Sequence, residues 1–553
     1  MVKFSELRHS IRSYVSNRHF RQFALQNGCA APHQARNKLP WGIDRLYRVL
    51  NLAKSGEDLL DDIFFQRFLD EGWTMQCTTL FGVQIIQTVD PQNVQAVLAT
   101  KFKDFEVGER RHKQFGVVLG KSIFTSDGPF WEHSRALFRP QFAREQINDL
   151  ASTEKSTQDL FQALGPVDEN GWTASVDILP LLYHFTLDTA TDFLFGQSVD
   201  SQLAALQTSK EDGDVAEKAG HVNAATDATH EDNFADAFAT ANEYMVLRIR
   251  LQGLYWLVNN TKLQRAVATM RRFTDQFVQL ALQHSQSSKR APSASEAADK
   301  ERYSLLSALA AQAQDPTEIR DQLLAILLAG RDTTAALLGW VLYVLATHPA
   351  LFQHLRAAVL AAFPPSSSSS THPVTFTSLK ACRYLTYVLN ETLRLYPPVP
   401  LNSRVALRDT VLPTGGGPDG SRPIAVRKGQ VVVFCVYAMQ RREDLWGSDA
   451  GVFRPERWEG RKLDWGFLPF SGGPRVCLGQ QYALTEAAYL VVRFLQRFDR
   501  IDPVSGADAD AAADAAGSRA APAAGKVEKG LGLIMSPRHG VRVRLHDAAA
   551  AAV

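Results

Sequence analysis

The chain has 553 residues, of which 45% are hydrophobic and 21% charged, as in a soluble globular protein and unlike a disordered or fibrous one. Its formal net charge of +2 gives no reason to expect a nucleic-acid partner. The five cysteines are widely spaced and include no Cys-x-x-Cys pair, which argues against a disulfide framework and favours a reducing compartment.

The first segment, residues 1–50, is basic and is predicted to contain an amphipathic helix. Its apolar face would hold Phe4, Leu7, Ile11, Tyr14 and Val15. Such a helix either lies on an anionic membrane surface or docks on its own domain, and the pattern favours the two equally. No apolar stretch of about 20 residues occurs near the N-terminus, so we expect no signal peptide and no spanning anchor in this chain.

The main domain is predicted to cover residues 51–546, followed by an Ala-rich tail at 547–553. Four low-complexity segments interrupt this domain, and we expect them to be mobile surface insertions without chemistry. They lie near residues 201–232, 285–300, 364–372 and 505–526.

A small β-region is predicted near the N-terminus. Residues 74–89 are rich in Thr, Val and Ile and are broken by Gly82, which indicates strands, and a short helix follows at 91–98. Residues 105–127 contain several glycines and are predicted to be a loop. Further strands are expected after residue 399, and the alternating pattern of residues 531–545 predicts a closing hairpin.

Two helices are predicted to carry pairs of polar residues. Trp131 and Arg135 stand four apart, so both project from one helical face, a pattern that by itself usually means packing plus a solvated charge. Glu391 and Arg394 are three apart in a helix predicted over residues 379–395. In most proteins such a pair lies on the surface and contributes little.

A long helix is predicted over residues 316–348, with the polar run Ala329-Gly-Arg-Asp-Thr-Thr334 at its middle. Gly330 removes side-chain bulk, while Asp332 and Thr333 offer local alternatives to the helical hydrogen bond, so a bulge or kink is expected. Each charge in this run would cost about 2.5–3.5 kcal/mol at the centre of a bilayer. We therefore expect a buried core helix.

The most informative stretch is the Gly/Pro loop Phe470-Ser-Gly-Gly-Pro-Arg-Val-Cys-Leu-Gly479, which delivers Cys477 to a helix predicted to begin near Leu478. The N–H groups and positive end of that helix favour a thiolate, a good ligand for iron. Gly473 and Gly479 permit tight turns, Phe470 offers an aromatic face and Arg475 a cation. A lone cysteine in such a turn is more often a buried structural residue.

The full pattern Phe-x-x-Gly-x-Arg-x-Cys-x-Gly resembles the cysteine-ligand loop of the cytochrome P450 superfamily, the haem-thiolate monooxygenases. The three polar motifs upstream occur in that family's order. The resemblance implies the cytochrome P450 fold, mainly α with a small β-region, and a haem b cofactor (iron protoporphyrin IX) with Cys477 as the axial metal ligand.

The resemblance also assigns roles to individual residues. Those expected to contact haem are Trp131, Arg135, Ala329, Gly330, Arg404, Phe470, Gly473, Arg475 and Gly479, with Trp131 and the three arginines on the propionate side. Asp332 and Thr333 are expected to help deliver protons during oxygen activation. Glu391 and Arg394 are expected to pair with Arg457 of the later run Phe453-Arg-Pro-Glu-Arg457 and to support folding and haem retention.

The runs at 134–142 and 397–404 resemble the fungal enzymes that hydroxylate n-alkanes and fatty acids at the chain end. This implies insertion of one atom of O₂ into a terminal C–H bond of an apolar substrate. Electrons would come from NADPH through a flavoprotein, NADPH-cytochrome P450 reductase, with cytochrome b5 as a second candidate donor. The expected pocket walls are Phe115, Phe124, Leu323, Ile326, Leu327, Val399, Leu401, Leu531 and Leu533.

Related fungal enzymes usually carry a spanning anchor, so its absence from this sequence is a departure from their pattern. Either the protein attaches only peripherally, or the start of this sequence omits the anchor. The expected location is the cytoplasmic face of the endoplasmic reticulum, with peripheral contact through residues 1–50. Two other functions stay open: hydroxylation of another apolar metabolite or xenobiotic, and haem binding without turnover. The intact Asp332–Thr333 pair argues against the last.

Overall fold

The structure, a computed structural model, describes residues 17–39, 42–51, 58–79, 82–143, 148, 150–203, 234–288, 305–312, 315–364, 374–504 and 527–550. The predicted apolar face at residues 4–15, most of the four low-complexity segments and the last three residues of the tail lie outside these ranges. Residues 285–288, expected to begin an insertion, are instead the end of a helix.

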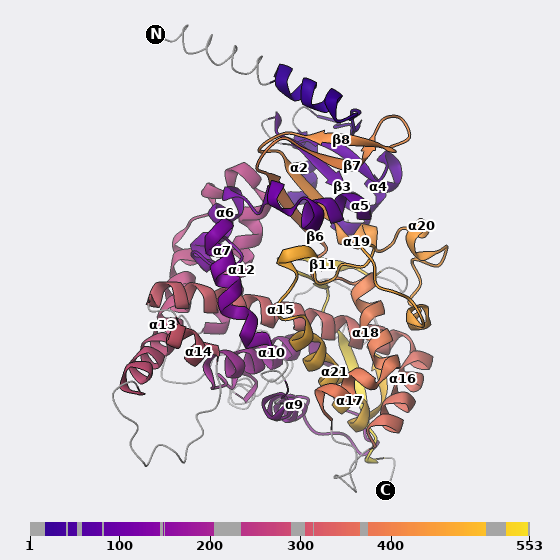
Figure 1. Ribbon diagram of the computed structural model, residues 1–553. Helices are drawn as coiled ribbons and strands as arrows, with labels where there is room; N and C mark the ends of the chain where they lie inside the picture. Colours follow the sequence, from indigo (N-terminus) through magenta and orange to yellow (C-terminus); the bar gives the residue numbers. More distant parts are fainter. Residues whose placement is uncertain are drawn as a thin grey trace.

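Helices dominate the molecule, as predicted (Figure 1). The longer ones are α6 (Glu109–Leu119), α7 (Gly128–Phe138), α9 (Ala151–Ala163), α10 (Ile178–Phe195), α12 (Phe234–Arg250), α13 (Thr261–Ser288), α15 (Pro316–Thr347), α16 (Pro349–Ala362), α18 (Arg383–Leu395) and α21 (Gln480–Arg497). Short α-helices are α2 (Ile43–Leu50), α4 (Gln66–Glu71), α5 (Pro91–Gln95), α14 (Leu305–Gln312), α17 (Phe376–Ala381), α19 (Val436–Met439) and α20 (Glu443–Trp446). Two π-helices are η2 (Leu59–Phe65) and η4 (Ala96–Thr100). Short 3₁₀ helices are η5 (Phe102–Asp104), η6 (Arg139–Phe142), η8 (Gln252–Leu257), η9 (Pro455–Trp458) and η10 (Gly473–Arg475).

The main sheet joins two distant parts of the sequence. Its order is β1-β2-β3-β9-β6-β4, so strands from near residue 80 pair with strands from beyond residue 400 at one end of the molecule (Figure 1). The bounds are β1 (His33–Gln34), β2 (Thr74–Thr78), β3 (Gln84–Thr88), β4 (Phe105–Glu106), β6 (Leu401–Ala406) and β9 (Val431–Cys435). This pairing brings β6, which follows the double proline, beside the N-terminal β-region that the sequence predicts.

Three smaller sheets complete the β-structure. Their orders are β10-β13-β5, β11-β12 and β7-β8. The bounds are β5 (Val176–Asp177), β7 (Thr410–Gly416), β8 (Arg422–Val426), β10 (Phe498–Pro503), β11 (Lys529–Leu531), β12 (Met535–Pro537) and β13 (Arg542–Asp547). The single hairpin predicted over 531–545 is therefore wrong. Only β11 and β12 form a hairpin, because Val543 and Leu545 of β13 bury against the helical core and pair with β10 instead.

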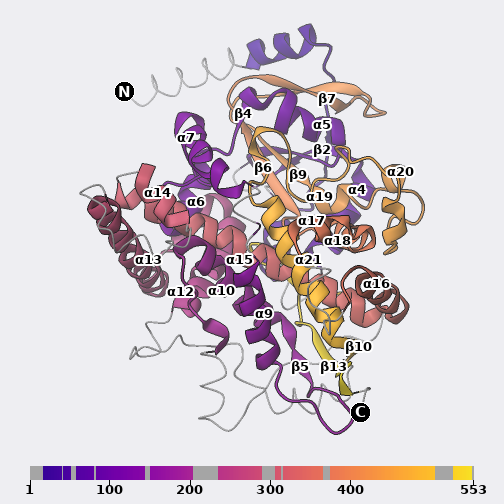
Figure 2. The same ribbon diagram turned by 60° about the horizontal axis from the view of Figure 1, so that its bottom comes forward.

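Helix α15 runs through the middle of the molecule, against α10, α18 and α21 (Figure 2). It begins as its sequence predicts, with Pro316 in the first turn and the Asp315 side chain accepting a hydrogen bond from the Thr317 N–H. It is the one described helix long and apolar enough to cross a membrane, but 78% of its most apolar window is buried inside the protein. We therefore assign it to the core.

Two predicted elements differ from those observed. Residues 109–119 form α6 where a loop is predicted, and the glycines mark its ends: Gly108 precedes it with φ +86° and Gly120 follows with φ +51°. A side chain at Gly120 would collide with Asp321, so the helix must stop there. The helix predicted over 379–395 is two helices, α17 and α18, that meet at Cys382.

Candidate active site

A cavity of about 1000 Å³ lies between α15, α12, α6, β6 and the cysteine loop. It collects almost all of the site residues that the sequence predicts, from five separate stretches of the chain. They are Phe115, Phe124, Trp131, Arg135, Ile326, Ala329, Gly330, Asp332, Thr333, Val399, Leu401, Arg404, Phe470, Arg475, Cys477, Gly479, Leu531 and Leu533.

Three of the residues predicted to contact haem or substrate lie elsewhere. Leu323 and Leu327 do not reach the cavity wall, because they pack in the apolar core between α15 and the helices around it, where they are 0% and 1% exposed. Their prediction as pocket walls is wrong. Gly473 also lies off the cavity. It has φ +67°, and a Cβ there would stand 1.9 Å from the Leu98 carbonyl oxygen, so the glycine is needed for packing on η4.

The cysteine loop is held in shape by its own backbone. The Cys477 N–H donates to the Phe470 carbonyl at 3.0 Å, and α21 starts at Gln480, two residues later than predicted. The Cys477 side chain is exposed to the cavity although the loop lies deep in the protein.

Burial raises the pKa of the Cys477 thiol, and the Gly479 N–H and the Arg135 guanidinium lower it less. The Gly479 N–H thus acts on the thiol in the direction that the sequence predicts, but burial has the larger effect. A metal cation at the sulfur would supply the missing positive charge and release the proton.

Four arginines gather at one side of the cavity: Arg111, Arg135, Arg404 and Arg475. Arg404 is 4% exposed, and burial together with the Arg111 and Arg475 cations lowers its pKa to about 9. Burial also lowers the pKa of Arg475 to about 10, although its Nη2 donates to Asp127 at 2.6 Å. Cations outnumber the carboxylates around them, so a ligand with two carboxylates, such as haem with its propionates, fits this cluster.

Arg111 is a member of this cluster that the sequence analysis missed. Its Nη2 donates to the Asn402 side chain at 2.7 Å, and Asn402 also accepts from Arg404 at 3.2 Å. Residue 111 lies in the stretch predicted as a loop, and no spacing signal singled it out. Recognising α6 would have placed Arg111 and Phe115 on one helical face.

Trp131 and Arg135 connect α7 to the cysteine loop. Arg475 stacks over the Trp131 ring, with its guanidinium carbon 4.2 Å from the ring centre. Arg135 Nη1 donates to the Val476 carbonyl at 3.0 Å, one residue before the cysteine. Both side chains of this helical pair therefore contact the cysteine loop directly and hold it against α7.

The polar run of α15 faces the same cavity. The Thr333 hydroxyl donates to the Ala329 carbonyl at 2.6 Å, which is the local alternative to the helical bond that the sequence predicts. A Cβ at Gly330 would meet only the Ala190 methyl at 3.8 Å, so the protein's own packing does not require glycine there. Its small size leaves space on the cavity side.

Asp332 is held by two neighbours, one of which the sequence analysis missed. Arg331 Nη1 donates to its Oδ1 at 3.0 Å, and the Asn242 side chain of α12 donates to its Oδ2 at 2.9 Å. Burial raises the pKa of Asp332, while Arg331 acts against that rise. An acid that is buried, near a cation and in contact with the cavity suits proton transfer.

Glu391, Arg394 and Arg457 form one buried network. Glu391 accepts from Arg394 Nε at 2.9 Å, from Arg457 Nε at 2.8 Å and from the Trp458 indole at 3.0 Å. Arg394 also donates to the carbonyls of Gln440, Ala450 and Val452. Each charge is thus both paired and hydrogen-bonded, as burial requires.

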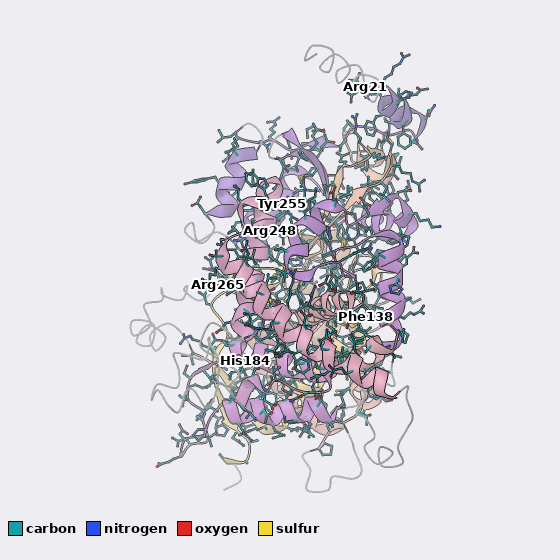
Figure 3. The ribbon with its side chains drawn as sticks, turned by 90° about the vertical axis from the view of Figure 1, so that its left-hand side faces the viewer. Arg21, Phe138, His184, Arg248, Tyr255 and Arg265 are labelled. Carbon is teal, nitrogen blue, oxygen red and sulfur yellow. The ribbon has the colours of Figure 1, made fainter. Side chains whose placement is uncertain are left out.

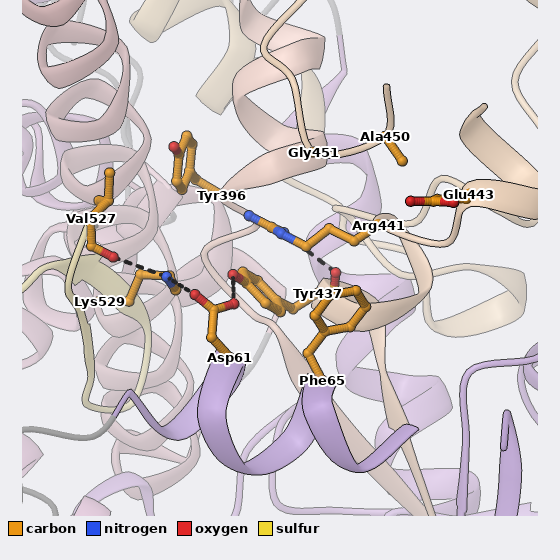
Figure 4. Close-up of a pocket in the computed structure, with 10 residues that line it drawn as sticks. All are labelled: Asp61, Phe65, Tyr396, Tyr437, Arg441, Glu443, Ala450, Gly451, Val527 and Lys529. Atoms are coloured by element: carbon orange, nitrogen blue, oxygen red, sulfur yellow. Dashed lines mark hydrogen bonds and ion pairs between the residues drawn. The ribbon is translucent and has the colours of Figure 1, made fainter. Parts of the chain in front are cut away.

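A second, smaller cavity of about 330 Å³ lies outside this site and is polar (Figure 4). Asp61 of η2 sits between Lys529, whose Nζ is 2.7 Å away, and the Tyr437 hydroxyl. Lys529 also pairs with Asp58 at 3.1 Å. These bonds tie β11 to η2, and β11 supplies Leu531 to the large cavity.

Comparison with known proteins agrees with this arrangement. Residues 45–508 match the model of the family described as Cytochrome P450. The chain is 44% identical over 493 residues to cytochrome P450 monooxygenase g430 of Fusarium sp, covering 89% of this chain and 83% of that protein. It is 43% identical to cytochrome P450 52A12 of Debaryomyces hansenii, covering 86% and 87% of the two chains.

Among solved structures, the crystal structure of the cytochrome P450DA heme domain superposes with a TM-score of 0.66. The match covers 94% of this chain and 97% of that chain at 21% identity, which supports the fold. The family match spans the helices, the sheet and the cysteine loop described above, and this chain belongs to the cytochrome P450 family.

Proposed function

We propose that this protein is a haem-dependent monooxygenase that hydroxylates the terminal carbon of long-chain fatty acids or n-alkanes. The observation that carries the proposal is a single cavity that joins Cys477 and Thr333 to walls of apolar side chains. The methyl group of an alkyl chain has stronger C–H bonds than the methylenes, so terminal attack requires a channel that presents the methyl first. The likeness of residues 134–142 and 397–404 to enzymes of that kind supports the same substrate class.

The residues present would hold haem through Cys477 as the iron ligand and through Arg404, Arg475 and Arg111 at the propionates. When bound, haem supplies the site at which O₂ is activated. Asp332 would move protons into the cavity from its position between Arg331 and Asn242. Thr333, whose own proton goes to the Ala329 carbonyl, offers its oxygen lone pairs as an acceptor on the cavity side.

We further propose that residues 51–546 form the monooxygenase domain and that it works at the cytoplasmic face of the endoplasmic reticulum. Electrons would come from NADPH through a flavoprotein reductase, with cytochrome b5 as a second candidate donor. The basic segment 1–50 supports contact with an anionic membrane surface.

The proposal is tested by a reduced-CO difference spectrum followed by an NADPH-dependent assay with the reductase, using dodecane and dodecanoate as substrates. We expect the absorption band of thiolate-ligated haem and a hydroxylated product from at least one substrate. A spectrum that shows this band, with no product from either substrate, would indicate a haem-binding protein without turnover. A protein that oxidises only compact polycyclic compounds would contradict the chain-end hydroxylase assignment.

A further inference from the structure

One face of α12 lines the large cavity and ends in a cation. Asn242, Val246, Ile249 and Arg250 follow the i, i+4, i+7, i+8 spacing of a single helical stripe, and the last three contact the cavity. The stripe starts beside Asp332, to which Asn242 donates. Arg250 lies eight residues farther on, which is about 12 Å along a helix. A guanidinium thus faces the cavity about two helical turns from the acid of α15.

Arg250 has no carboxylate partner among the described residues. Its Nη2 donates to the Leu531 backbone carbonyl at 2.6 Å, and its pKa is lowered by burial without any neighbouring charge to offset the loss. A guanidinium has five N–H donors, so most of the Arg250 donors remain for a ligand. A partly buried cation of this kind binds a carboxylate well, in the two-pronged geometry that arginine favours.

Strand β11 fixes the position of Arg250 through a hydrogen bond. Its acceptor, Leu531, is the last residue of that strand, and Lys529 at the start of the strand pairs with Asp58 and Asp61 (Figure 4). The ion pairs of Lys529 beside the small cavity therefore hold β11 in place, and β11 in turn orients Arg250. A preorganised group loses less entropy when its ligand binds.

The neighbouring arginines have other tasks. Arg248, two residues earlier, is buried beside Tyr255 (Figure 3). It donates to the carbonyls of Lys113, Gln114, Tyr255 and Val258. The arginines at 111, 404 and 475 belong to the cluster that would hold the haem propionates. Arg110 of α6 contacts the cavity but is exposed to solvent.

We propose that Arg250 binds the carboxylate of a long-chain fatty acid and that the protein therefore prefers fatty acids to alkanes of equal length. The inference rests on the proposed function and names its substrate class. With the carboxylate at Arg250, the chain runs along Ile249 and Val246 toward Thr333, so the methyl end reaches the oxygen side of the cavity first.

The test is titration of the ferric holoenzyme with dodecanoate, methyl dodecanoate and the quaternary amine dodecyltrimethylammonium, which has no lone pair to bind iron. The spectral change at haem on substrate binding is followed. Wild type should bind dodecanoate at least tenfold more tightly than the amine, which the guanidinium repels. Arg250→Gln should weaken dodecanoate binding roughly ten- to hundredfold, the usual effect of losing a charge-assisted bond, and change methyl ester binding less than about twofold. Arg110→Gln, the matched cavity arginine, should leave all three affinities within about twofold of wild type.

Equal weakening of acid and ester in Arg250→Gln would overturn the inference, as would an effect on the acid that appears in Arg110→Gln instead. If Arg250→Gln does not retain haem, Arg250→Lys keeps the charge and should still bind acid more tightly than amine. Equal binding of acid and amine by wild type overturns the inference without any variant. These are binding measurements, so they decide the role of Arg250 even if the products prove not to be terminal alcohols.

Discussion

At the scale of single residues, Cys477 carries the assignment of the cofactor. Its side chain faces the cavity, and burial raises the pKa of its thiol, an effect that a metal cation at the sulfur would oppose. Cys477→Ser should abolish the reduced-CO band typical of thiolate-ligated haem, because an alcohol keeps its proton and is a poor soft ligand. Persistence of that band in the variant would falsify the ligand assignment.

Thr333 should affect how efficiently electrons are used. Thr333→Ala removes the Thr333 hydroxyl from the cavity and leaves the residues that would contact haem unchanged. Less product should therefore form per NADPH consumed, and more peroxide should be released. Product formed per NADPH measures this directly. Thr347→Ala is the matched control, because Thr347 makes the same bond to a helical carbonyl, Tyr343, but lies exposed at the end of α15. Equal coupling in wild type and Thr333→Ala would remove Thr333 from the mechanism.

Glu486 of α21 should make stability depend on pH. Burial raises its pKa from an ordinary 4.5 to about 8, and hydrogen bonds such as that from Thr189 lower it less. The folded protein therefore keeps a proton that the unfolded chain loses above pH 4.5, so this contribution to stability declines as pH rises from 4.5 to about 8.

The side chain in Glu486→Gln cannot ionise, so this variant should be more stable than wild type at pH 8. The size of the pKa shift predicts a difference in unfolding free energy on the order of a few kcal/mol. At pH 5 the difference should shrink below about 1 kcal/mol. Thermal unfolding of both proteins at the two pH values is the measurement. A pH-independent difference between them would show that Glu486 is not the titrating group.

At the scale of elements, the Glu391 network joins α18 to the chain that leads into the cysteine loop. Glu391→Gln leaves Arg394 buried without a countercharge and Arg457 paired only with Asp449, at 3.2 Å. The change should cost about 3–5 kcal/mol of stability and accelerate haem loss. Glu456→Gln is the control, because Glu456 also accepts a hydrogen bond, from Tyr384, but is exposed, and it should cost less than about 1 kcal/mol. Chemical denaturation of both variants compares the two, and similar losses would contradict the role of burial.

Elements with a strong local signal could be predicted from sequence. Helix α15 has its cap, its proline and its apolar length, and the stretch around Gly82 that forms two strands is rich in Thr, Val and Ile. The exceptions have physical reasons. Helix α6 carries the side chains of Arg111 and Gln114 toward polar partners, so its apolar period is weak. Strand β13 pairs with β10 through burial that no local pattern records.

The site residues likewise divide into those with a local sequence signal and those without one. Residues in motifs with fixed spacing, such as those around Cys477 and Thr333, could be found because their chemistry is unusual for their position. Leu323 and Leu327 could not be distinguished from Ile326, since core and cavity walls use the same apolar side chains. Asn242 and Arg250 lie on α12, which follows a low-complexity insertion. They reach the site only because α12 contacts α15, and no local sequence pattern indicates that contact.

At the scale of the whole molecule, the fold brings the cysteine loop, the polar run of α15 and the stripe of α12 around one cavity. The sulfur of Cys477 and the guanidinium of Arg250 both open into it, so a chain-like substrate can be held at one end and oxidised at the other. This arrangement is the central claim, because an oxidant without such a guide would attack the weaker methylene C–H bonds.

The most direct test is gas chromatography of the alcohols formed by the reconstituted enzyme from a series of fatty acids, dodecanoate to octadecanoate. The cavity described here predicts that terminal alcohols are the majority product for at least one chain length. A majority of in-chain alcohols at every length would contradict it, while the family assignment and the haem-binding residues would stand.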